Sequence, residues 1–150
     1  MPDQRMVVLN DVAELRRMST WLRQCADAAE MPADLAHKLD VCANEAVTNI
    51  ISYAYDDGRH HEITLEFAET PSGLSLLIRD DGKPFNVQEA PEHAAPTSLD
   101  DAEIGSLGIH LMRRLLPQFD YQREDGFNVL TLNTGHKLAP GNESKVTGLL

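Results

Sequence analysis

The feature that most constrains the fold is a helical pattern over residues 39–55, which read LDVCANEAVTNIISYAY. At ~100° per residue, the apolar side chains of this stretch and of the turn before it fall within a band roughly 80° wide. These side chains are Leu35, Leu39, Cys42, Ala46 and Ile50. Such a band is typical of a helix that packs one face against a hydrophobic core. Pro32 and Asp34 predict its opening turn, and the Asp-Asp-Gly sequence at 56–58 predicts its end.

Two polar side chains lie at the margin of this band. Glu45 and Asn49 are four residues apart, so a helix stacks them one turn apart on the same face. Because this face borders the apolar band, we expect the pair to line a cleft rather than to face bulk water. An ordinary solvated helix face would give the same spacing, so the pair needs support from the rest of the chain.

Length and composition indicate one globular domain. The chain has 150 residues, of which 42% are hydrophobic and 25% charged. It contains no apolar run of the roughly 18 residues that a membrane span requires. Its first residues, MPDQRMVVLND, carry neither the basic region nor the apolar core of a signal peptide. We therefore expect a soluble, cytoplasmic protein that does not bind membranes.

The charge balance limits the possible ligands. With 13 basic and 24 acidic residues, the net charge is −11, which opposes the electrostatic attraction on which nucleic-acid binding depends. We therefore expect no direct contact with nucleic acid. If so acidic a chain binds a nucleotide, backbone amides and a divalent cation must handle the phosphates in place of a lysine-rich pocket.

The sequence gives no sign of a metal site built from histidines or cysteines, or of a disulfide. The six histidines lack the spacing of known metal-binding motifs. Cys25 and Cys42 both lie within helical apolar patterns, which predicts buried free thiols.

The remaining periodicities predict an α+β fold. Residues 5–9 form a short apolar run typical of an edge strand, and residues 12–29 repeat apolar side chains at helical spacing after a possible cap at Asn10 or Asp11. Period-two alternation predicts one hairpin over 62–78 and a second over 119–124 and 127–133, with a short helix at 109–116 between them. We expect a single-domain, two-layer sandwich in which about three helices cover one face of a mixed, mostly antiparallel sheet. The domain is expected to span 1–135, followed by a disordered tail at 136–150.

Two further segments carry possible chemistry, and a long segment without regular pattern lies between them. The second strand of the first hairpin runs into the sequence Asp80-Asp81-Gly82-Lys83-Pro84-Phe85, which leaves a carboxylate at the strand end. Residues 85–104 contain two prolines and no sustained period, and their length predicts a mobile lid. They are followed by Gly105-Ser106-Leu107-Gly108, a turn whose backbone amides could approach phosphate oxygens at a helix start. A helix-initiating turn would look similar.

Three segments stand in a fixed order: the helix with Glu45 and Asn49, the segment 80–85, and the turn 105–108. Together they resemble the GHKL ATPases, the superfamily of gyrase, heat-shock chaperone, histidine kinase and mismatch-repair ATPase domains. E-A-x-x-N followed by A-Y, then D-x-G-x-P-F, then G-x-L-G-I, most resembles the anti-sigma-factor serine kinases of bacterial partner switching. The resemblance covers residues 6–133 and implies a Bergerat-type ATP-binding fold. It implies ATP and Mg²⁺ as cofactors.

The resemblance also implies a role for each matching residue. Glu45 matches the general base, and Asn49 matches the asparagine that holds the Mg²⁺. Asp80 matches the acceptor for the adenine amino group, and Gly82 matches the glycine that lets the base approach the backbone. The phosphate-cradling turn corresponds to Gly105, Ser106, Leu107 and Gly108, with Ser106 where relatives commonly have a second glycine. Thr131, in the last strand, is a weaker match to a threonine on the adenine side.

The resemblance leaves two functions open. The first is an ATP-dependent protein serine kinase that sequesters a sigma factor or analogous regulator and phosphorylates a small anti-anti-sigma-type protein. The second is a nucleotide-gated sequestering protein with little or no kinase activity. Retention of Glu45 favours the first. The resemblance also implies a homodimer, formed through the N-terminal strand and the first helix.

Overall fold

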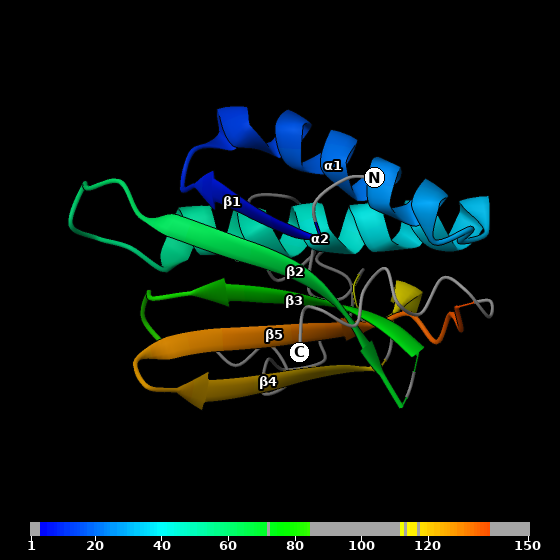
Figure 1. The fold of residues 1–150 in the computed structure, drawn as a ribbon. Coiled ribbons are helices and arrows are strands. Elements are labelled where there is room, and N and C mark those ends of the chain that lie inside the picture. The colour runs from blue at the N-terminus through cyan, green and yellow to red at the C-terminus, as the bar shows by residue number, and fades with distance from the viewer. Residues whose placement is uncertain (1–3, 72, 85–111, 113, 117, 139–150) are drawn as a thin grey trace, which may run out of the picture.

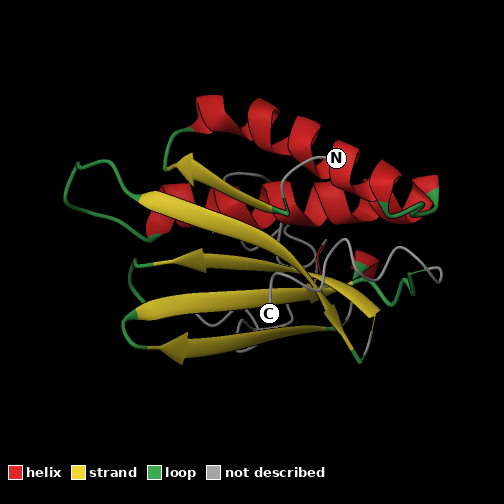
Figure 2. Ribbon diagram, viewed as in Figure 1, coloured by secondary structure: helices red, strands yellow, loops and turns green. Residues whose placement is uncertain are grey.

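The computed structural model describes residues 4–71, 73–84, 112, 114–116 and 118–138. Two long helices lie against one side of a five-stranded sheet, so the described chain forms two layers (Figure 1). Figure 2 shows the same arrangement by element type. The elements are β1 (Arg5–Leu9), η1 (Val12–Glu14), α1 (Leu15–Ala28), α2 (Ala33–Tyr53), β2 (Glu62–Thr70), β3 (Gly73–Asp80), β4 (Phe119–Glu124) and β5 (Phe127–Asn133).

The strand order is β1-β2-β3-β5-β4, and all four pairings are antiparallel. The α+β class and the two layers are as expected, but the expectation of a mixed sheet is wrong for the described strands. Tight turns join β2 to β3 and β4 to β5, and a tight turn can join only antiparallel neighbours. β5 then pairs with β3 in the same antiparallel sense, which places Asp80 opposite Asn128.

The core lies between the sheet and the helices. One set of alternating side chains on the central strands is fully or almost fully buried, including Ile63, Leu65, Phe67, Leu76, Ile78, Leu130 and Leu132. The helices contribute Met18, Trp21 and Leu39, and the ring of Trp21 lies 5.4 Å from that of Phe67, measured between centroids. Both cysteines are buried and form no disulfide, as expected.

Helix α2 begins at Ala33, directly after Pro32, and ends at Tyr53. The start agrees with the sequence pattern, but the end comes two residues earlier than the 39–55 pattern indicated. Tyr55 has already left the helix, and its ring stacks on His61 at a centroid distance of 4.0 Å. The ring of His61 in turn contacts the carboxylates of Asp57, at 2.8 Å, and Asp81, at 3.4 Å. This cluster joins the loop after α2 to the turn after β3.

β1 is an edge strand, as expected, and side chains around the start of α1 cover part of it. The guanidinium Nη2 of Arg17 donates to the carbonyl of Val7 at 2.8 Å, and the amide of Leu9 donates to Oε1 of Glu14 at 3.0 Å. Glu14 and Arg17 are themselves paired at 2.9 Å. Of the two possible caps, Asp11 is the one used, since its side chain accepts from the amide of Ala13.

The C-terminal end of the described chain packs onto the domain beyond the expected boundary at 135. The carbonyl of His136 accepts from the amide of Leu74 at 2.8 Å, and Leu138 is buried. Residues 139–150 lie outside the described residues. Of the helix expected at 109–116, Met112, Arg114 and Leu115 are helical and the rest lies mostly outside the description.

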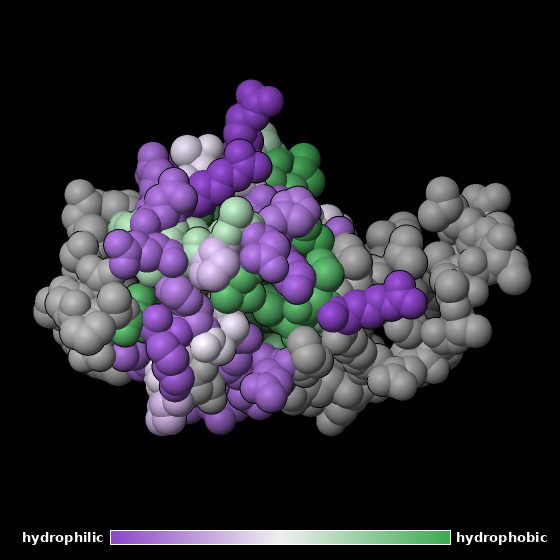
Figure 3. Space-filling model, turned by 90° about the vertical axis from the view of Figure 1, so that its right-hand side faces the viewer, coloured by the Kyte–Doolittle hydropathy of each residue, from purple (hydrophilic) through white to green (hydrophobic). Residues whose placement is uncertain are grey.

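On the face shown in Figure 3, hydrophilic residues cover most of the described surface and hydrophobic residues appear between them in smaller areas. Among the helices described here, none combines the length and the apolar character that crossing a membrane requires.

Candidate functional site

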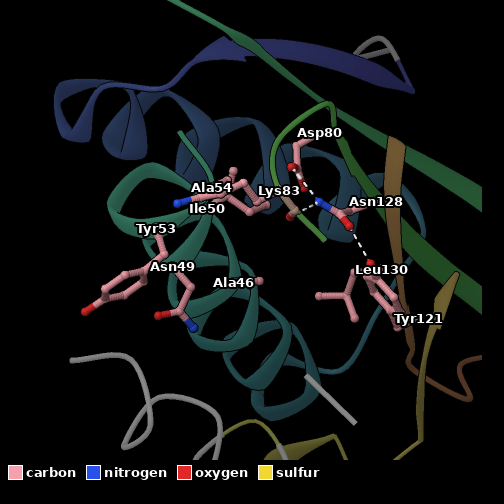
Figure 4. A pocket seen from close by; sticks show the side chains of 10 residues that line it. All are labelled: Ala46, Asn49, Ile50, Tyr53, Ala54, Asp80, Lys83, Tyr121, Asn128 and Leu130. Atoms are coloured by element: carbon pink, nitrogen blue, oxygen red, sulfur yellow. Dashed lines mark hydrogen bonds between the residues drawn. The ribbon is translucent and has the colours of Figure 1, made fainter. Parts of the chain in front are cut away.

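A pocket opens between the C-terminal half of α2 and the sheet, where β3, β4 and β5 meet. It is narrow, with a cavity volume of about 40 Å³. Figure 4 shows α2 side chains on one wall and sheet side chains on the other. The lining residues are Ala46, Asn49, Ile50, Tyr53, Ala54, Asp80, Lys83, Tyr121, Asn128 and Leu130.

The α2 wall presents a buried amide. Asn49 is 8% exposed, and its Nδ2 has no hydrogen-bond partner among the described residues. Leaving a buried polar atom unpaired is costly, so an unpaired amide in a pocket marks a place where a ligand or ion can bind. Turning the amide over would place its oxygen at the same unpartnered position.

Glu45 lies one turn before Asn49 on the same helix and is half-buried. The residues that line the described pocket do not include it. Burial raises the pKa of the Cys42 thiol, on the preceding turn, to about 11, and the negative charge of Glu45 adds to the rise. Glu45 therefore lies beside the core at the margin of the apolar band, as the helical spacing predicted.

Asp80 is the last residue of β3 and lines the pocket from the side of the sheet. It is only 3% exposed, and its Oδ1 accepts from the amide of Gly82 at 2.9 Å and from Nδ2 of Asn128 at 3.0 Å. Burial raises the pKa of Asp80, and these two hydrogen bonds partly oppose the rise. A buried carboxylate that lines a pocket and has a perturbed pKa is typical of a functional site.

Gly82 brings the turn after β3 into direct contact with the end of α2. A Cβ at this position would lie 2.4 Å from the Cβ of Ala54 and 2.8 Å from its carbonyl oxygen. The next amide, that of Lys83, donates to the carbonyl of Ala54 at 3.0 Å. Only glycine permits this approach, so Gly82 fixes the distance between the two walls of the pocket.

The structure brings Asn49 and Asp80 together at this pocket and packs Gly82 against Ala54 beside it, but it does not bring Thr131 there. In β5 the side chains of Asn128 and Leu130 face the pocket, and Thr131, one residue further, faces the opposite side of the sheet. The polar side chain that the last strand places beside Asp80 is Asn128. Sequence reasoning missed it, although Asn128 is in phase with Leu130 and Leu132, which is an unusual place for an amide.

The expected lid at 85–104 and the turn of Gly105, Ser106, Leu107 and Gly108 lie outside the described residues.

The described walls fit the ligands that the sequence resemblance implies. A carboxylate that is held by two donors can accept from an amino group, and an amide oxygen is among the hard ligands that Mg²⁺ prefers. The surface that lines the pocket is largely apolar, which suits a flat heterocycle.

This two-layer domain, with a polar pocket between its second helix and an antiparallel sheet, has a known family. Residues 8–134 match the model of the histidine kinase-like ATPase domain, so the chain belongs to that family. The family resemblance seen in the sequence is thereby confirmed, and with it ATP as the nucleotide of the domain.

Named relatives specify the branch of the family. The serine/threonine-protein kinase BtrW of Bordetella bronchiseptica is 38% identical over 114 residues, which cover 76% of this chain and 80% of that protein. The serine-protein kinase RsbW of Listeria monocytogenes is 26% identical over 124 residues, or 80% of this chain and 78% of the relative. That of Bacillus subtilis is 25% identical over 100 residues, or 64% and 62%. These relatives confirm the enzyme class that the sequence predicted, a protein serine/threonine kinase.

Solved structures support the fold alone. The histidine kinase domain of the blue-light activated histidine kinase from Erythrobacter litoralis EL346 superposes with a TM-score of 0.50 at 16% identity. The match covers 81% of this chain and 62% of that domain chain. A longer chain of the same kinase gives a TM-score of 0.51, with 41% of its length covered.

Proposed function

We propose that the chain is an ATP-dependent protein serine kinase of a partner-switching circuit, which phosphorylates a small anti-anti-sigma-type protein and sequesters a sigma factor or analogous regulator. The observation that carries the proposal is the buried carboxylate of Asp80, held by two donors in a pocket that also contains the unpaired amide of Asn49. The serine kinases among its relatives support the choice of acceptor residue.

In this proposal each described residue has a separate role. Asp80 accepts from the exocyclic amino group of adenine, which guanine replaces with an acceptor at the equivalent position. Asn49 would hold Mg²⁺, whose chemistry is to neutralise and orient the phosphates. Glu45, one turn from Asn49, removes the proton from the attacking serine hydroxyl. The turn of Gly105, Ser106, Leu107 and Gly108 is proposed to supply backbone amides to the phosphates.

Phosphoryl transfer requires mainly positioning and charge neutralisation, so this small set of groups is sufficient. The shared helix supports the division of labour, since Glu45 and Asn49 stay one turn apart whatever else moves. We further propose that the chain acts as a homodimer.

The test is Glu45→Gln, which removes the base and keeps the shape of the side chain. Transfer of labelled γ-phosphate from ATP to the small protein that co-purifies with the chain should fall by about 10²-fold or more. ATP affinity, measured by calorimetry, should stay within about twofold of wild type, since a general base contributes little to ground-state binding. Glu62→Gln, at an exposed position on β2, serves as the matched control. A Glu45→Gln variant that transfers phosphate at the wild-type rate would overturn the role of Glu45.

One observation favours the second function, a nucleotide-gated sequestering protein with little kinase activity. Glu45 is half-buried and is not among the residues that line the described pocket. The same assay separates the two functions. ATP-dependent retention of the partner without phosphate transfer by the wild-type chain would favour sequestration alone.

A further inference from the structure

Asn128 lines the pocket and makes several hydrogen bonds there, although the proposed function gives it no role. It is 6% exposed and stands opposite Asp80 in the register of β3 and β5. Its Nδ2 donates to Oδ1 of Asp80 at 3.0 Å and to the carbonyl of Lys83 at 2.8 Å, and lies 3.4 Å from the carbonyl of Gly82. An amide nitrogen has two hydrogens, so the two shorter contacts use both.

The orientation of this amide is fixed from its other side. Oδ1 of Asn128 accepts from Nη1 of Arg123 at 3.1 Å and from the hydroxyl of Tyr121, as Figure 4 shows for the tyrosine. A guanidinium can only donate, so the atom facing Arg123 must be the oxygen. The nitrogen therefore points at Asp80 by necessity, and a flipped amide would place two acceptors against each other.

The same hairpin holds the backbone of the turn. Nη1 of Arg123 donates to the carbonyl of Gly82 at 2.7 Å, next to the carbonyl of Lys83 that Asn128 binds. Side chains from β4 and β5 thus hold the turn after β3 at two successive carbonyls. Almost all donors and acceptors of this network have hydrogen-bond partners, and a buried network of this kind favours a single arrangement of its side chains.

We propose that Asn128 is a positioning residue for nucleotide recognition: it holds Oδ1 of Asp80 and the turn that follows, so that Oδ2 of Asp80 is the atom left to accept from the base. This inference rests on the proposed function. Within the described residues, Oδ1 accepts from Gly82 and Asn128, whereas no described residue donates to Oδ2. Because Asn128 presents a neutral donor, it favours the ionised form of Asp80 without neutralising its charge, and only that form has no proton to offer the base.

Two substitutions separate positioning from packing. Asn128→Ala removes the donor and leaves a space. Asn128→Asp keeps the shape and the contact to Arg123 but places a second carboxylate against Asp80, which disfavours ionisation of both. In ligand-free protein, the carboxyl ¹³C shift of Asp80 should titrate at a higher pH in both variants than in the wild type, with the larger displacement in Asn128→Asp.

ATP binding should be weakened in both variants, and more in Asn128→Asp than in Asn128→Ala. Calorimetry with ATP and with GTP, between pH 5 and pH 8, should give an ATP affinity about tenfold lower at pH 7 for Asn128→Ala, the scale of one hydrogen bond to a charged group. As the pH is lowered, the ATP affinity of the variants should begin to fall at a higher pH than that of the wild type. The ratio of ATP affinity to GTP affinity should decrease. If Asn128 had only a structural role, its replacement would lower the melting temperature without changing the pH at which ATP affinity falls.

Asn133 offers a matched control, because it is an asparagine of the same strand on the opposite face, where it bonds Ser75 and Asp120. Asn133→Ala should leave the titration of Asp80 and the ATP preference unchanged. Asn128 variants that keep the wild-type titration of Asp80 would overturn the inference, and so would equal loss of ATP and GTP at every pH. If the wild-type chain binds no ATP, the proposed function fails, whereas the titration of Asp80 still reports on its contact with Asn128.

Discussion

The substitution Asp80→Asn tests the binding site most directly, because the structure predicts that it changes recognition and stability in opposite directions. An asparagine at position 80 can still present an oxygen to the two donors that hold Asp80 now, the amide of Gly82 at 2.9 Å and Nδ2 of Asn128 at 3.0 Å. The turn should therefore keep its shape. What changes is the second atom, which becomes a donor where adenine also offers a donor.

The loss of ATP affinity follows from that mismatch. A hydrogen bond to a charged group contributes about 1.5–3 kcal/mol, and since each 1.4 kcal/mol corresponds to a factor of ten, affinity should fall by roughly 10- to 150-fold. Stability should rise at neutral pH. Burial raises the pKa of Asp80, so the folded chain resists its ionisation and holding the charge above that pKa costs folding free energy. Below the unfolded pKa, near 4, the wild type carries no charge there and this part of the difference disappears.

Two measurements on the same samples check this. Calorimetric titration with Mg-ATP gives the affinity, and urea unfolding at pH 7 and at pH 4 gives the stability. Asp81→Asn is the control, since Asp81 is adjacent but about half exposed and is paired with His61 outside the pocket. Wild-type affinity in Asp80→Asn would refute the assignment of the adenine site. Lower stability at pH 7 would refute the argument that burying this charge is costly.

Three further substitutions test the framework around the site. Gly82→Ala should destabilise the fold by about 1–3 kcal/mol in urea unfolding, because its Cβ would lie 2.4 Å from that of Ala54; Ala54→Gly in the same chain should recover part of the loss, and no recovery would place the strain elsewhere. His61→Gln should reduce stability mainly at low pH, because the hydrogen bond to Asp57 raises the pKa of His61 in the folded chain. The contribution of protonated His61 to stability is complete below the pKa of the unfolded chain, near 6.5, and is lost as the pH rises through the pKa of the folded chain. A pH-independent difference would contradict this. Phe67→Ala, at a 1% exposed core position, should cost about 3–5 kcal/mol by the same measurement, and a loss below 1 kcal/mol would contradict the burial.

The sequence predicted those parts of the site that depend on local spacing. Glu45 and Asn49 share a helix face because four residues make about one turn, and the carboxylate of Asp80 ends a strand that glycine and proline stop. Fold class was predictable for the same reason, since the periods of 3.6 and 2 are properties of single segments.

The parts that were missed depend on which strands become neighbours. Asn128 reaches Asp80 only because β5 pairs with β3 in one register, and no local pattern states that register. The placement of Thr131 away from the pocket could have been predicted, since strict alternation puts it out of phase with Leu130 and Leu132. The end of α2 was placed two residues too late, because the stacking of Tyr55 on His61 is a side-chain contact in the loop after the helix, which helical spacing alone does not indicate.

The ion pair beside β1 has a consequence for how copies of the chain behave together. An exposed strand edge is a template for backbone pairing with other strands, which can lead to aggregation, and here the carbonyl of Val7 is already occupied by Arg17. Repulsion between copies disappears near pH 4.8, where the chain has no net charge. At that pH Glu14 is still ionised, because its bonds to Arg17 and to the amide of Leu9 lower its pKa to about 2. The cover over this edge therefore persists under the mildly acidic conditions in which colloidal stability is lowest.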